Sequence, residues 1–122
     1  MDSIINTKTE KEFLFKIFIL FFSESERSIK QNKSFNLAIS GGETPKKVFS
    51  FLINNFQNKM QWKYFNFYWV DERCVHPSDS KSNFKHANDI LLSKISEIGS
   101  VNRIYSEINK EKAAKIAARK RN

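Results

Sequence analysis

The sequence predicts an α/β fold, an open parallel β-sheet with helices on both faces, which is a Rossmann-like three-layer sandwich. Segments with helical and with strand periodicity alternate along the chain, and such alternation is typical of parallel sheets. The segment Tyr64–Val70 is almost continuously aromatic and apolar, as in a strand that is covered on both faces. A glycine-rich turn at Ser40–Pro45 separates a strand pattern from a helix pattern. The length of 122 residues fits a single domain, residues 1–122.

The first helix is predicted from Thr9 to about Gln31. The Thr9 hydroxyl can cap this helix while Glu12 reaches back, which is a capping-box pattern. The apolar arc of the helix is wide as far as Phe22, which predicts burial on more than one side. A short strand follows at Ser34–Ile39, with its apolar side chains on one face.

A second helix follows the glycine-rich turn. We expect Thr44 to cap it and Pro45 to take its first position, because a proline there loses no hydrogen bond. Apolar side chains recur at helical spacing and form its inner stripe, which consists of Val48, Phe49, Leu52, Ile53 and Phe56.

The rest of the chain continues the alternation. After the strand Tyr64–Val70, a loop at Asp71–Ser82 leads to a third helix at about Asn83–Ser96. Val101–Tyr105 is predicted as a third short strand and Lys110–Arg119 as a fourth helix. Three short strands that end on an exposed basic helix make a small sheet for this architecture, so we expect the domain to be incomplete.

Composition supports a folded chain and narrows the class of partner. Hydrophobic residues make up 40% of the chain and include 12 phenylalanines, enough for a real core. The net charge is +8, yet Lys110–Arg121 alone hold six basic side chains and one acidic side chain. A surplus crowded into one terminal helix is typical of a solvated helix end, so we do not expect nucleic-acid binding.

Cysteine usage and hydropathy indicate a cytoplasmic protein. Cys74 is the only cysteine, so no internal disulfide can form and a reducing compartment is the simplest setting. The apolar run Phe13–Phe22 is too short to span a bilayer, and Lys16 interrupts it. Acidic residues precede this run where a signal peptide would be basic, so we expect no membrane segment.

Two polar clusters follow the first two predicted strands. The crossover between these strands is right-handed and the strands run the same way, so both clusters lie at the sheet edge where ligands bind. In the first cluster, Gly41 and Gly42 let the backbone approach a ligand, and the next helix offers its N-terminus to an anion. Ser40 and Thr44 add hydroxyl groups. An ordinary strand-to-helix turn explains these residues equally well.

The second cluster is Asp71–Arg73, at the exit of the apolar strand. Arg73 can hold a phosphate or a carboxylate through two parallel hydrogen bonds. Asp71 or Glu72 can orient a hydroxyl group, or a catalytic histidine from elsewhere. A salt-bridged loop exit is the alternative interpretation. The thiol of Cys74 is expected to be passive, because a lone cysteine in a strand-exit loop is rarely a nucleophile.

Three separated motifs carry a family resemblance. They are Leu37–Pro45, Asp71–Val75 and Ser82–Phe84, and their order and spacing also fit. Through them the chain resembles the N-terminal half of the 6-phosphogluconolactonase family, within the superfamily that also holds glucosamine-6-phosphate deaminases. The Asp-Glu-Arg and Ser-Asn forms favour the lactonases, because the deaminases resemble one another through an Asp-Glu-Tyr form.

The resemblance implies hydrolysis of 6-phosphoglucono-δ-lactone to 6-phosphogluconate in the oxidative pentose phosphate pathway, without a metal or an organic cofactor. It implies two catalytic residues: Arg73 contacts the bound anion, and Asp71 helps orient the catalytic base. The sugar phosphate is expected to lie against Ser40, Gly41, Gly42, Thr44, Arg73, Ser82 and Asn83.

The catalytic base of the family is a histidine in a Gly-x-Asp-Gly-His-Thr motif of the second half, and this sequence lacks that motif. Neither His76 nor His86 stands in such a context, so we expect binding without a base for turnover. Glu43 replaces a small hydroxyl residue of the family's turn and puts a carboxylate near the anion site. His76 stands where a proline is usual, which is expected to loosen the loop.

Two alternatives remain. An isomerase or deaminase related to the glucosamine-6-phosphate enzymes would use Asp71 as its proton-transfer group. A truncated, non-catalytic remnant would only bind sugar phosphates, and its exposed apolar sheet edge would favour self-association.

Overall fold

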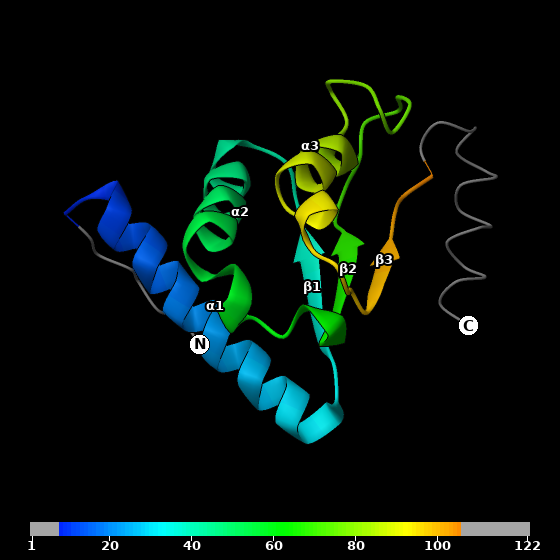
Figure 1. Ribbon diagram of the computed structural model, residues 1–122. Coiled ribbons are helices and arrows are strands. Elements are labelled where there is room, and N and C mark those ends of the chain that lie inside the picture. The colour runs from blue at the N-terminus through cyan, green and yellow to red at the C-terminus, as the bar shows by residue number, and fades with distance from the viewer. Residues whose placement is uncertain (1–7, 106–122) are drawn as a thin grey trace.

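The computed structural model describes residues 8–105. In chain order its helices and strands are α1 (Glu10–Asn32), β1 (Phe35–Ile39), α2 (Glu43–Phe56), β2 (Phe65–Trp69), α3 (Asn83–Ile90) and β3 (Ser100–Asn102). Short 3₁₀ turns lie at Gln57–Lys59, Trp62–Tyr64 and Leu92–Lys94. Figure 1 shows the predicted alternation of helices and strands. The helix predicted at Lys110–Arg119 lies outside the described residues.

The three strands form one parallel sheet in the order β1-β2-β3 (Figure 1). In its register, Leu37 lies opposite Phe67, and Phe67 lies opposite Val101. This is the open parallel sheet that the sequence predicts. Because all three strands run the same way, their carboxyl ends share one edge of the sheet.

The helices α2 and α3 contact each other over one face of this sheet. Both crossovers step to the next strand in the same direction, and right-handed crossovers of that kind place their helices on one face. The helix α1 packs against α2 and along β1, on the outer side of the first strand (Figure 1). The described residues therefore build their core on one side of the sheet.

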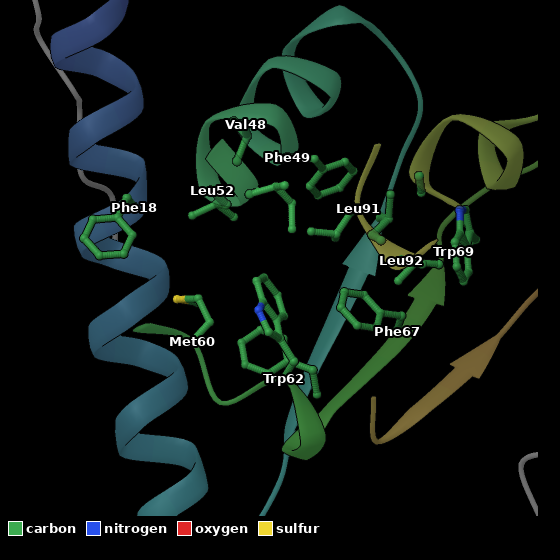
Figure 2. Packing of buried hydrophobic residues seen from close by; sticks show 14 of the residues in the cluster. Phe18, Val48, Phe49, Leu52, Met60, Trp62, Phe67, Trp69, Leu91 and Leu92 are labelled. Carbon is green, nitrogen blue, oxygen red and sulfur yellow. The ribbon is translucent and has the colours of Figure 1, made fainter. Parts of the chain in front are cut away.

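The core combines aliphatic and aromatic side chains, and several of the aromatic ones are labelled in Figure 2. Phe65, Phe67 and Trp69 alternate along β2 and point into the core. The ring of Phe18 on α1 stacks on Phe56 at the end of α2, with ring centroids 3.7 Å apart. Each fully buried side chain of this size contributes about 1.5–3 kcal/mol through removal of apolar surface from water.

The other face of the sheet is polar in the described part of the chain. Asn66 Nδ2 donates to Asn36 Oδ1 at 3.0 Å, and Ser100 Oγ donates to Asn66 Oδ1 at 2.8 Å. These bonds cross all three strands. Tyr68 on the same face is 42% exposed. Within residues 8–105, the prediction that Tyr64–Val70 is covered on both faces therefore holds for one face, because α2 and α3 share that face.

The start of α1 agrees with the predicted cap. Thr9 Oγ1 accepts a hydrogen bond from the Glu12 N–H at 3.1 Å, whereas the Glu12 carboxylate accepts from the Lys8 N–H at 3.4 Å. The wide apolar arc is not buried all round among the described residues, because Phe15 and Ile19 remain exposed. No helix within residues 8–105 is both long and apolar enough to cross a membrane.

The start of α2 differs from the prediction. The helix begins at Glu43 and its N-cap is Gly42, so Thr44 is not the capping residue. Gly42 has φ +113°, which turns the chain into the helix earlier than the hydroxyl pattern suggested. Pro45 consequently occupies the third helical position, where a backbone N–H also lacks an intrahelical acceptor.

The third helix is shorter than predicted. It ends at Ile90 rather than near Ser96, and a 3₁₀ turn follows at Leu92–Lys94. Leu91, with φ −119° and ψ −65°, leaves the helical path. The apolar spacing continued to Ile95 because this side chain also packs against the core, although it lies beyond the helix.

Candidate functional site

The carboxyl ends of β1 and β2 bring the two polar clusters to one edge of the sheet (Figure 1). The Val70 N–H donates to the Ile39 carbonyl at 2.9 Å, directly where the two strands end. The segments Ser40–Thr44 and Asp71–Arg73 leave the sheet from this point. The topology therefore places the two clusters together, as the strand order predicts.

Each glycine of the turn is required for a different reason. Gly42, with φ +113° and ψ 176°, lies in a backbone region that is essentially restricted to glycine. Gly41 packs against the side chain of Asn83, and a Cβ atom on Gly41 would lie only 2.1 Å from Asn83 Oδ1. Gly42 is therefore required by its backbone conformation, and Gly41 is required by the close approach of Asn83.

The N-terminus of α2 is the feature that attracts an anion. Its first amides lack intrahelical acceptors and carry the positive end of the helix dipole, and Gly42 has no side chain to cap them. Ser40 and Thr44 are exposed beside this end. Glu43 is exposed as well, and Lys46 Nζ lies 3.2 Å from Glu43 Oε1, which offsets part of the carboxylate charge.

Glu72 is tied to the start of α3 by hydrogen bonds to both carboxylate oxygens. Its Oε1 accepts from the N–H groups of Arg73 at 2.8 Å and Asn83 at 2.7 Å. Its Oε2 accepts from the Ser82 hydroxyl at 2.9 Å and from the Phe84 N–H at 2.9 Å. Glu72 therefore caps the first turn of α3 from the preceding loop, together with Ser82 at the N-cap position.

These contacts change the acidity of Glu72. Burial opposes the charged form, but hydrogen bonds from the backbone of Phe84, Asn83 and Arg73 and from the Ser82 hydroxyl outweigh it. The pKa of Glu72 therefore lies below its ordinary value of 4.5. The carboxylate is more acidic folded than unfolded, so its charge stabilises the fold at neutral pH.

We predict a corresponding pH dependence of stability. The contribution of Glu72 is complete above its unfolded pKa of 4.5 and is lost as the pH falls through the lower folded value. Urea unfolding of the parent chain and of Glu72→Gln, between about pH 7 and about pH 3, measures it. The stability gap between the two proteins is expected to shrink below pH 4.5. A gap that stays constant over this range would contradict the prediction.

Asn83 connects the second cluster to the glycine turn. Its Oδ1 accepts from Arg73 Nη1 at 2.6 Å. Its Nδ2 donates to the Asp71 carbonyl at 3.2 Å and to Asp71 Oδ1 at 3.3 Å. The residue is only 4% exposed, and its side chain also lies against Gly41. One buried amide thus holds Arg73, Asp71 and the glycine turn in a single arrangement.

The predicted site residues fall into two groups. An exposed group lies at the open side of the sheet edge and consists of Ser40, Gly42, Thr44, Asp71 and Arg73. A second group, Ser82 and Asn83, is buried and already hydrogen-bonded within the protein. Gly41 lies between the two groups, against Asn83.

Sequence reasoning did not place Glu72 among the site residues. It considered Glu72 only as a group that orients a hydroxyl or a histidine. A carboxylate in the loop that precedes a helix can cap that helix, because the first amides of a helix need acceptors. In this chain the carboxylate lies 11 residues before the amide of Asn83 that it caps, a distance that no short sequence motif specifies.

Within residues 8–105, the side chains of the two histidines and of Cys74 are not hydrogen-bond partners of Glu72 or Asn83. The His76 ring accepts from the Ser78 N–H at 3.1 Å and contacts the Ser78 hydroxyl at 2.6 Å, so it is engaged within its own loop. His86, on α3, lines a small cavity behind the glycine turn. Cys74 is exposed and free.

Comparison with known proteins identifies relatives of this fold. The family model described as glucosamine-6-phosphate isomerases/6-phosphogluconolactonase matches residues 9–122. The 6-phosphogluconolactonase of Treponema pallidum is 42% identical over 59 residues, which are 48% of this chain and 24% of that protein. The chloroplastic 6-phosphogluconolactonase 3 of Arabidopsis thaliana is 32% identical over 91 residues, or 74% of this chain and 28% of that protein.

A solved structure extends the comparison to the fold. The 6-phosphogluconolactonase of Trypanosoma brucei superposes with a TM-score of 0.77 at 22% identity, over 99% of this chain and 48% of that one. The chain thus spans about half the length of this solved relative. The match over residues 9–122 shows that the chain belongs to the glucosamine-6-phosphate isomerase/6-phosphogluconolactonase family.

Proposed function

We propose that this chain provides the sugar-phosphate-binding part of a 6-phosphogluconolactonase. The observation that carries the proposal is the uncapped N-terminus of α2, which begins at the same carboxyl edge of the sheet as Arg73. Asn83 contacts both segments, because it accepts from Arg73 and lies against Gly41. The glycine turn lets backbone amides approach an anion, and Arg73 supplies a guanidinium group that suits a phosphate or a carboxylate. Ser40 and Thr44 add exposed hydroxyl groups for the sugar.

The proposed reaction is hydrolysis of 6-phosphoglucono-δ-lactone. A water oxygen attacks the lactone carbonyl carbon, the bond from that carbon to the ring oxygen breaks, and the ring oxygen takes up a proton. The attack requires a base within hydrogen-bond reach of the water. His76 is engaged with Ser78 in its own loop, and His86 lines the small cavity behind the glycine turn, so neither is proposed as the base. We propose instead that the base is a histidine outside this sequence and that Asp71 orients it.

Glucosamine-6-phosphate isomerase is the second candidate activity, because the description of the matching family covers both enzymes. In a glucosamine-6-phosphate isomerase, the exposed carboxylate of Asp71 would transfer the proton. Release of ammonia from glucosamine 6-phosphate distinguishes the two, since a lactonase releases none. Strong ammonia release would overturn the lactonase proposal.

Calorimetric titration of the purified chain with 6-phosphogluconate tests binding, with gluconate as the matched ligand that lacks the phosphate. We expect saturable binding of 6-phosphogluconate only. Lactone hydrolysis, corrected for spontaneous ring opening, is then measured on the same sample. Equal affinity for the two ligands would contradict a phosphate site at α2, because gluconate keeps the carboxylate and lacks only the phosphate. Hydrolysis above background would contradict the assignment of the base to a histidine elsewhere.

A further inference from the structure

We propose that Glu72 is a positioning residue of the anion site, an inference that rests on the proposed function. Glu72 holds the start of α3 and thereby sets how Arg73 faces the glycine turn. Anion binding then depends on a negatively charged side chain that does not touch the anion.

The hydrogen bonds of Glu72 are directed into the protein. A carboxylate offers about four acceptor sites, and four donors from residues 73, 82, 83 and 84 occupy both oxygens of Glu72. Three of these donors are backbone N–H groups, which are fixed by the fold. Glu72 therefore has no acceptor site to spare for a hydroxyl group of the sugar or for an incoming histidine.

This capping also decides which helix end receives the anion. The two helices that follow β1 and β2 both begin at the same edge of the sheet. At α3 the Asn83 and Phe84 N–H groups already donate to Glu72. At α2 the cap residue is Gly42, which provides no side-chain acceptor. An anion at this edge is therefore directed to α2.

Asn83 links Glu72 to the anion site. Its backbone N–H donates to Glu72, while its side chain accepts from Arg73 and donates to Asp71. The same side chain lies against Gly41. A change at Glu72 is thus expected to move Arg73 and Gly41 relative to each other, although Gly41 makes no hydrogen bond to Glu72.

The variant Glu72→Gln tests this role because two explanations predict opposite signs. Removal of a negative charge near an anion site should strengthen anion binding if charge alone matters. In the positioning role, the new amide cannot accept from all four donors, and we expect the affinity for 6-phosphogluconate to fall roughly tenfold. The matched control Glu43→Gln removes a charge at the same sheet edge without breaking these bonds, and its affinity is expected to stay equal or to rise.

A variant remote from the site shows whether lower stability alone weakens binding. Ser28→Ala removes a hydrogen bond from Ser28 Oγ to the Ser34 carbonyl. This bond lies at the amino end of β1, opposite the carboxyl end that carries the site, so the variant should weaken folding without changing affinity. If Glu72→Gln does not fold, Glu72→Asp keeps the charge but shortens the reach and should also weaken binding. Affinity equal to or tighter than that of the parent chain, in whichever variant folds, would overturn the proposal.

A ligand-free readout keeps this inference distinct from the proposed function. The amide chemical shifts of Gly41 and Gly42 are compared between the parent chain and the folded Glu72 variant. Changes at both glycines would support the link from Glu72 through Asn83 to the glycine turn. If 6-phosphogluconate then fails to bind, only the proposed function is contradicted. Unchanged shifts at Gly41 and Gly42 would refute the positioning role.

Discussion

Gly41→Ala is expected to lower the free energy of unfolding by about 1–3 kcal/mol and to weaken 6-phosphogluconate binding roughly 100-fold. The new Cβ would lie 2.1 Å from Asn83 Oδ1 and 2.7 Å from Asn83 Cγ. Asn83 cannot rotate away freely, because it is buried and its amide holds Arg73 and Asp71. Urea unfolding and calorimetric titration measure the two effects.

The double variant Gly41→Ala/Asn83→Ala isolates this contact. Removal of the Asn83 side chain creates room for the added methyl group, so Gly41→Ala should cost little stability in the Asn83→Ala background. Gly42→Ala serves as the comparison: its Cβ would make only an ordinary contact with Pro45 Cδ at 3.9 Å, but its φ of +113° imposes backbone strain of about 1–3 kcal/mol. Additive effects of Gly41→Ala and Asn83→Ala would show that the contact is not the cause.

Arg73→Ala is expected to weaken 6-phosphogluconate binding by about 10- to 100-fold, because the charge-assisted hydrogen bonds of its guanidinium group are lost. Stability should fall by only about 1 kcal/mol, since the exposed side chain leaves one buried acceptor, Asn83 Oδ1, without the Arg73 donor. Titration of 6-phosphogluconate at several salt concentrations measures the effect, which should diminish as salt screens the anion.

Two further variants show whether the loss of affinity is specific to the guanidinium group of Arg73. Arg73→Lys keeps the positive charge but lacks the planar fork, so it should recover only part of the affinity. Arg27→Ala removes another exposed arginine, on α1, where it pairs with Glu24, and should leave binding unchanged. If Arg73→Ala and Arg27→Ala weaken binding equally, net charge rather than a located site explains the affinity.

Local chemistry explains why much of the fold could be predicted. The Thr9 cap, the apolar stripe of α2 and the apolar run of β2 are each contained in short segments, so their signals do not depend on distant residues. The end of α3 was missed for a related reason. Apolar spacing continues through Ile95, and spacing alone cannot distinguish a helix from a following turn that packs against the same core.

The order of helices and strands, the parallel sheet and the edge at which both polar clusters meet could all be predicted from the sequence. Periodicity and the handedness of crossovers are sufficient for those conclusions. Two features depend on how distant segments pack: Glu72 caps α3, and Asn83 contacts both Gly41 and Arg73. These contacts join segments that are apart in the chain, and the orientation of α3 on the sheet sets their distances. No local pattern encodes that orientation.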